Sequence, residues 1–109
     1  SITLLKNSNL LINAGVIVNS LAQIGKGVIL NTGCIIEHEC VIGDFSHIAP
    51  GAVLAGNVEI GRRTFVGANS VLKQGVKIGS NVTIGAGSVI LNDIEDNQTV
   101  VGNPGKKIW

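Results

Sequence analysis

The feature that most constrains this chain is an aliphatic residue at every sixth position, without insertion or deletion, from residue 12 to residue 90. A six-residue period fits neither the 3.6-residue repeat of an α-helix nor a hairpin meander. Because strand side chains alternate, two positions in each hexad can point inward before the chain turns a corner. The anchors are Ile12, Val18, Ile24, Leu30, Ile36, Ile42, Ile48, Leu54, Ile60, Val66, Leu72, Ile78, Ile84 and Ile90.

A second, longer period of three hexads indicates how the hexads stack. The pair Ile24–Gly25 recurs at every third hexad, as Ile42–Gly43, Ile60–Gly61 and Ile78–Gly79. Three hexads therefore close one triangular coil, and each coil pairs with the next as parallel strands. We expect an all-β parallel β-helix with four to five triangular coils over 10–91, a lead-in at 1–9 and a short C-terminal tail at 92–109, all in a single domain.

The residue that follows each anchor is often Gly or Asn, two types that tolerate the backbone conformations of sharp corners. We therefore expect the corners to bend at this phase of the repeat. These positions are Gly25, Asn31, Gly43, Gly61, Gly67, Gly79 and Gly85.

Composition narrows the function classes. Hydrophobic residues make up 45% of the chain but aromatics only 3%, so the core is built from Ile, Val and Leu. A net charge of +1 gives no electrostatic case for nucleic acid or a membrane surface, and no apolar run approaches the ~18 residues of a membrane span. Cys34 and Cys40 share one phase of the repeat, which predicts buried free thiols and favours a reducing cytoplasm.

One corner of the triangle carries residues suited to catalysis. Residues one coil apart lie above one another, so Gly56 stacks directly on His38, and Glu37 and Glu39 flank the histidine. Histidine is the side chain best suited to general-base work near neutral pH, and a carboxylate beside it can fix its tautomer. The small residue next to it leaves room for a ligand and a backbone N–H to face it. The alternative is a solvated corner histidine with two solvating charges.

A second histidine, His47, lies half a coil further on at an outward phase. Within one chain the two histidines lie on different parts of the coil, whereas across a threefold interface they can converge. The alternative is that His47 only packs at a subunit contact. Apolar residues, aliphatic except for Phe65, occupy the same outward phase, which indicates a partner interface and a homotrimer. They are Ile17, Ile29, Ile35, Val53, Phe65, Val71 and Val89.

Two stretches resemble a known family. They are residues 31–52, with Glu37-His38-Glu39 and His47, and residues 100–108, with Gly102-Asn103-Pro104. Together with the hexads they resemble the bacterial transferase hexapeptide superfamily, in the branch of sugar acetyltransferases of sialic acid and bacillosamine-type pathways. The resemblance covers about residues 10 to 109 and implies a left-handed β-helix. That branch usually carries an N-terminal sugar-nucleotide domain, which is absent from this sequence.

The resemblance also implies a role for each matching residue. His38 would be the general base, oriented by Glu39 or, less favoured, Glu37. His47 would lie near the acetyl group of acetyl-CoA, the Gly56 N–H would bind the thioester carbonyl, and Asn31 would lie near the acceptor sugar. The remaining cofactor contacts would be Gly67, Ala68, Gly85 and Ala86 along the pantetheine, with Gly102, Asn103, Pro104 and Lys106 or Lys107 at the adenine end.

The resemblance thus implies an acetyl-CoA-dependent acetyltransferase that acts by direct attack on the thioester, with the amino group of a nucleotide-linked amino sugar as the expected acceptor. O-acetylation of a sugar or a sialic acid is the alternative within this class, and a non-catalytic scaffold is the alternative outside it. A zinc enzyme like the γ-class carbonic anhydrases needs three strong ligands, but the chain has two histidines, so we expect no metal. Ice binding needs a threonine column, which the sequence lacks.

Overall fold

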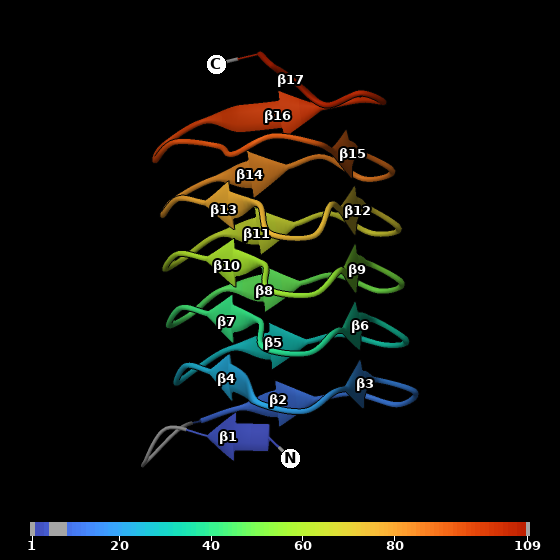
Figure 1. Cartoon of the computed structure of the whole chain (residues 1–109), viewed down its shortest axis with the longest axis vertical. Coiled ribbons are helices and arrows are strands. Elements are labelled where there is room, and N and C mark those ends of the chain that lie inside the picture. Colours follow the sequence, from blue (N-terminus) through green and yellow to red (C-terminus); the bar gives the residue numbers. More distant parts are fainter. Residues whose placement is uncertain (1, 5–8, 109) are drawn as a thin grey trace.

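Short parallel strands on three flat faces form the protein. A computed structural model describes residues 2–4 and 9–108. Each hexad contributes one short strand, and every third strand pairs, so the chain climbs as a triangular left-handed β-helix (Figure 1). It measures 35 × 23 × 21 Å along its principal axes. The described residues contain no helix, and therefore none that could span a membrane.

Three sheets make up the faces. The first face contains β1 (Ile2–Leu4), β4 (Ala22–Ile24), β7 (Val41–Ile42), β10 (Glu59–Ile60) and β13 (Lys77–Ile78). The second face contains β2 (Leu11–Ile12), β5 (Ile29–Leu30), β8 (His47–Ile48), β11 (Phe65–Val66), β14 (Thr83–Ile84), β16 (Thr99–Val101) and β17 (Lys106–Lys107). The third face contains β3 (Ile17–Val18), β6 (Ile35–Ile36), β9 (Val53–Leu54), β12 (Val71–Leu72) and β15 (Val89–Ile90).

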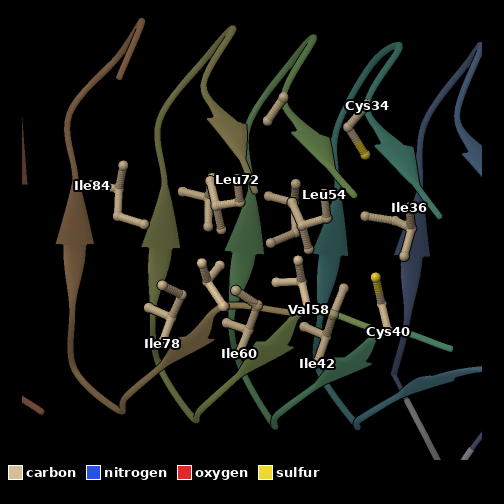
Figure 2. Packing of buried hydrophobic residues seen from close by; sticks show 14 of the residues in the cluster. Cys34, Ile36, Cys40, Ile42, Leu54, Val58, Ile60, Leu72, Ile78 and Ile84 are labelled. Atoms are coloured by element: carbon tan, nitrogen blue, oxygen red, sulfur yellow. The ribbon is translucent and has the colours of Figure 1, made fainter. Parts of the chain in front are cut away.

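Parallel pairing at a constant register of three hexads joins the central coils, as between Leu54 and Leu72 or Ile24 and Ile42. Because this register is a whole number of hexads, every anchor lies over another anchor. The aliphatic side chains therefore stack in columns along the axis, where the coils bury them against one another (Figure 2). The predicted hexad core is confirmed from Ile24 to Ile90.

The first coil differs from the others in burial. Ile12 is 46% exposed and Val18 is only half-buried, although both are anchors. The described chain places a further strand beneath this coil on one face only, where Ile2 pairs with Ala22. The exposed anchors are therefore those beneath which the described chain places no strand.

At the C-terminal end the β-helix continues past residue 91, but the register between paired strands becomes shorter. Ile94 bridges to Ile78, and Thr99 pairs with Thr83, so that each pairing falls two residues short of three hexads. Ile94 and Val100 thereby join the core. The chain then reverses, and β17 pairs antiparallel with β16. The predicted tail thus has two parts, one that extends the stack and one that turns back over it.

The expected phase of the corner bends was wrong. Positive φ angles occur at the third residue after the anchor and not at the first, in thirteen consecutive hexads from Gly15 to Gly87. Leu21, Glu39, Phe45 and Arg63 adopt this conformation together with glycines and asparagines. The glycines directly after the anchors serve a different purpose, because a Cβ on Gly67 would lie 2.5 Å from the backbone N of Ala86. They permit close stacking of backbone on backbone.

Candidate functional site

The three corners of the triangle carry different side chains, and we name them by one residue each. The Asn31 corner follows the second face, at residues 13–16, 31–34, 49–52, 67–70 and 85–88. The His38 corner follows the third face, at 19–22, 37–40, 55–58 and 73–76. The Phe45 corner follows the first face, at 25–28, 43–46, 61–64 and 79–82.

At the His38 corner, the imidazole of His38 lies directly beneath Gly56, which is on the next coil. A Cβ added to Gly56 would be 2.6 Å from both Cε1 and Nε2 of the ring. Gly56 does not have a positive φ, so backbone conformation does not require a glycine there. The glycine is needed because the imidazole occupies the place of its side chain. The predicted juxtaposition of the histidine and the small residue is therefore present.

The two glutamates beside His38 have different partners. Oε1 of Glu39 lies 3.7 Å from Nδ1 of His38, and both side chains are about half exposed, at 54% and 51%. Glu37 instead accepts a hydrogen bond of 2.9 Å from Nδ2 of Asn19, one coil below. With Nδ1 directed to Glu39, the ring presents Nε2 on the side of Gly56. Of the two carboxylates, that of Glu39 is therefore the one that lies within salt-bridge distance of the imidazole.

The backbone N–H of Gly56 is available to a ligand. Its neighbours Ala55 and Asn57 donate to the carbonyls of Leu72 and His38, and the Gly56 carbonyl accepts from Gly75. Within the described part of the chain, the Gly56 N–H donates no hydrogen bond. A buried residue with a free N–H beside a histidine is a suitable donor for an oxygen that gains negative charge.

His47 and Asn31 lie together on the other side of the third face. His47 projects from β8 and is half-buried, with its ring edge-on to Phe65 at a centroid distance of 5.2 Å. Nδ2 of Asn31 is 3.3 Å from Nε2 of His47. Asn13 donates a hydrogen bond of 2.8 Å to Oδ1 of Asn31 from the coil below. Asn13, Asn19 and Phe65 were not among the predicted site residues, although Asn13 lies one full coil before Asn31.

The remaining predicted cofactor contacts lie along the Asn31 corner. Gly67 stacks against Gly85 and Ala86, with Ala68 beside them. The tail loop lies at the top of this corner, because the N–H of Gly102 donates to Oγ of Ser88 and its carbonyl accepts from the N–H of Val89. Asn103 and Pro104 follow in this loop, and Lys106 begins the returning strand β17, exposed beside Val101. Asn31 and the tail loop thus mark two ends of one ridge.

The predicted site residues therefore fall on two ridges with the third face between them. One chain does not bring His38 and His47 together. The outward positions of the third face form an unbroken aliphatic column, Ile17, Ile35, Val53, Val71 and Val89. The corresponding column of the first face is mostly polar or charged, with Gln23, Val41, Glu59 and Lys77.

A hollow of about 470 Å³ lies higher on the His38 corner, lined by residues 73–76 and 91–93. It forms where the register becomes two residues shorter, so that the last coil no longer covers this corner. In the part of the chain that the structure describes, no group of three or more His, Cys, Asp or Glu side chains is placed to hold a metal ion.

The cysteines are buried structural thiols, as the repeat predicts. Cys34 and Cys40 are both free and fully buried, and Cys40 donates a hydrogen bond to the carbonyl of Ala55. Burial raises the pKa of the Cys34 thiol to about 11, and burial also raises the pKa of Cys40. Neither thiol is suited to act as a nucleophile at neutral pH.

The unbroken hexads and three parallel sheets define the class, a hexapeptide-repeat β-helix. The family model described as bacterial transferase hexapeptide (six repeats) matches residues 21–56, 39–74 and 57–92. The chain belongs to this family. A comparison with curated protein sequences gave no match.

Several solved structures are similar over nearly the whole chain. The acetyltransferase domain of PglB from Neisseria gonorrhoeae FA1090 is 33% identical over 99% of this chain and 58% of its own, with a TM-score of 0.80. PerB from Caulobacter crescentus, in complex with CoA and GDP-perosamine, is 34% identical over 100% of this chain and 55% of its own, with a TM-score of 0.89. WeeI from Acinetobacter baumannii AYE is 28% identical over 98% and 54%, with a TM-score of 0.75. The chain thus spans a little over half the length of these proteins.

Proposed function

We propose that this chain is the catalytic β-helix of an acetyltransferase that moves an acetyl group from acetyl-CoA to the amino group of a nucleotide-linked amino sugar. The observation that carries the proposal is the stacking of His38 on Gly56. The imidazole of His38, as the base, and the N–H of Gly56, as the oxyanion donor, lie on adjacent coils of the same corner, as acyl transfer requires. Similarity to PerB, which was solved with CoA and GDP-perosamine, supports an amino sugar as acceptor.

In the proposed reaction, His38 is the general base and Glu39 orients it. The amine nitrogen attacks the thioester carbonyl carbon, and Nε2 of His38 takes the proton that the amine releases. The N–H of Gly56 stabilises the oxygen that becomes negative. The carbon–sulfur bond then breaks as the carbonyl re-forms in the new amide, and His38 passes its proton to the CoA sulfur, which leaves as a thiol. No covalent enzyme intermediate is needed, because both substrates meet at the same place.

The second ridge would supply the rest of the site. The small residues Gly67, Ala68, Gly85 and Ala86 give the pantetheine a path without side chains in the way. The loop at Gly102, Asn103 and Pro104 would contact the adenine end, with Lys106 or Lys107 near its phosphate. Because the aliphatic column of the third face separates the two ridges, the complete site would form between subunits of a homotrimer. We expect this enzyme in the cytoplasm, where acetyl-CoA is available.

The same geometry suits a sugar hydroxyl as acceptor, and O-acetylation is therefore the second candidate. A direct assay separates them. The purified chain is incubated with acetyl-CoA and either an amino sugar nucleotide or its hydroxyl analogue, and product mass and free thiol are followed. We expect acetylation of the amine and a fall of about 10²- to 10⁴-fold in kcat for His38→Ala. A normal rate in His38→Ala would contradict the assignment of the base, and an acetylated hydroxyl alone would favour the second candidate.

A further inference from the structure

The hydrogen bonds around Asn31 fix the orientation of its amide. The backbone N–H of Thr32 lies 2.7 Å from Oδ1 of Asn31. A backbone N–H can only donate, so the atom that faces it must be the amide oxygen. Nδ2 of Asn13 donates to the same oxygen at 2.8 Å, and the hydroxyl of Thr32 lies 3.3 Å from it. A flipped amide would set its NH₂ group against these donors.

The fixed amide in turn decides where His47 carries its proton. The NH₂ group of Asn31 faces Nε2 of His47 at 3.3 Å. An amide NH₂ only donates, so Nε2 must be the acceptor. A neutral imidazole with an unprotonated Nε2 carries its hydrogen on Nδ1. Phe65, edge-on to the ring at an interplanar angle of 88°, packs beside the imidazole.

The free end of this chain of hydrogen bonds is Nδ1–H of His47. Among the residues that the structure describes, Nδ1 of His47 makes no hydrogen bond, and the side chain is half-buried. His47 thus offers a donor to a ligand, while its lone pair is occupied by Asn31. His38 has the other ring nitrogen free. Its Nδ1 faces the carboxylate of Glu39, so Nε2 is the nitrogen that is open to a ligand.

We propose that Asn31, aligned by Thr32 and Asn13, is a positioning residue that holds His47 as the Nδ1–H tautomer, so that His47 acts as a hydrogen-bond donor to a carbonyl or anionic oxygen and not as a base. The tautomer follows from the hydrogen bonds alone. The identity of the oxygen, that of the acetyl group in the transition state, rests on the proposed function. The two histidines then divide the work, with proton uptake at His38 and charge stabilisation at His47.

The tautomer is tested by NMR without any substrate. Long-range ¹⁵N–¹H correlations of labelled histidine distinguish the two tautomers, and the His38→Gln variant leaves His47 as the only histidine. The spectra are recorded at about pH 8.5, two units above the ordinary histidine pKa of about 6.5. We expect the Nδ1–H form. The Nε2–H form would overturn the proposal.

Asn31→Asp is the decisive variant. One carboxylate oxygen still accepts from Thr32 and Asn13, but the other now replaces the NH₂ group and requires a donor from His47. We expect the ring to place a hydrogen on Nε2. Asn19→Asp is the matched control, an asparagine of the neighbouring corner that also donates to the coil above it, and it should leave His47 unchanged. If Asn31→Asp does not fold, Asn31→Ala should give a mixture of both tautomers. An unchanged tautomer in a folded Asn31 variant would overturn the proposal.

Kinetics then test the role in the reaction. Loss of one oxyanion donor costs about 10²- to 10³-fold in kcat, so Asn31→Asp should lower kcat while KM for the acceptor amine is unchanged. A rise in KM for the acceptor with normal kcat would instead place Asn31 in direct contact with the sugar and overturn the positioning role. If no variant and no parent protein transfers acetyl groups, the proposed function fails, but the NMR result still decides the tautomer.

Discussion

The imidazole of His38 occupies the space beside Gly56, on the coil above it, that a side chain at that position would fill. The three-hexad register creates this relationship, since it sets every residue over the one a coil earlier. A corner side chain that lies along the axis, as the imidazole of His38 does, therefore requires a small residue on the adjacent coil. The position of the His38 ring therefore depends on the size of residue 56, and substitutions at Gly56 should affect activity by displacing that ring.

Gly56→Ala should reduce activity without unfolding the chain. The added Cβ would lie 2.6 Å from the ring, so the imidazole must move by about 1 Å or more. Misplacement of this size can lower the rate about 100-fold. Because Gly56 does not have a positive φ, alanine is not strained there. Acetyl transfer and thermal unfolding, measured on the same sample, check both expectations.

Gly75→Asn is the matched control. It lies one coil above Asn57 at a φ of 80°, a region that asparagine tolerates and that Asn57 already adopts. Nothing lies within 4 Å of a Cβ at Gly75, so the fold should accept this change with near-normal activity. Equal loss of activity in both variants would contradict a specific effect of Gly56 on His38.

Truncation of an anchor should lower the free energy of unfolding much more than truncation of an outward residue. Leu54 is fully buried between coils, and Leu54→Ala should lower the free energy of unfolding by about 2–5 kcal/mol. Val41 projects outward from the first face and is 38% exposed, so Val41→Ala should cost well under half as much. Urea unfolding of both variants measures the difference. Similar losses would show that the hexad anchors do not carry the core.

The sequence was sufficient for the fold because one physical rule acts at every hexad. Ile24, Leu54 and Ile84 are buried for the same reason, so an uninterrupted period predicts the whole stack. It could not predict where the rule stops. Ile94 and Val100 are core residues, but the register shortens by two residues before them, which shifts them out of the series.

The candidate site was predicted only in part. His38 and Gly56 share a column, and a column is readable from the sequence. Asn31 and His47 do not share one, because a corner amide here reaches a strand side chain diagonally, at a separation that is not a whole coil. Likewise, the sequence did not predict which glutamate lies beside His38. Glu37 is hydrogen-bonded to Asn19, whereas the backbone turn at the corner places Glu39 near the imidazole, and the six-residue spacing predicts neither contact.

The aliphatic column of the third face should support subunit association. Val53→Asp introduces a charge at the middle of this column, and a buried unpaired charge strongly disfavours an interface. Val41→Asp makes the same change on the first face, between Gln23 and Glu59, and should have no effect on assembly. Light scattering at micromolar concentration should give a trimer for the parent protein and Val41→Asp, and a monomer for Val53→Asp. A parent protein that is a stable monomer would contradict a site between subunits.

Stability should fall at alkaline pH because of the buried thiols. Burial raises the pKa of Cys34 from 9.0 to about 11, so between these values the unfolded chain loses a proton that the folded chain keeps. The contribution is fully present below pH 9.0 and is lost as pH rises toward about 11, at up to about 1.4 kcal/mol per pH unit. The chain contains no tyrosine to titrate in this range. Urea unfolding should show a shallower pH slope for Cys34→Ala, and equal slopes would contradict the assignment.

The most direct test of the central claim is isothermal titration of acetyl-CoA into the purified protein, together with His38→Ala. Because His38 is assigned to proton transfer and the cofactor contacts lie elsewhere, we predict saturable binding near one site per subunit in both proteins. With His38→Ala inactive, this result would separate binding from chemistry as the account requires. No binding to either protein, at high concentration and in the assembled state, would contradict the acetyltransferase assignment and leave a non-catalytic β-helix.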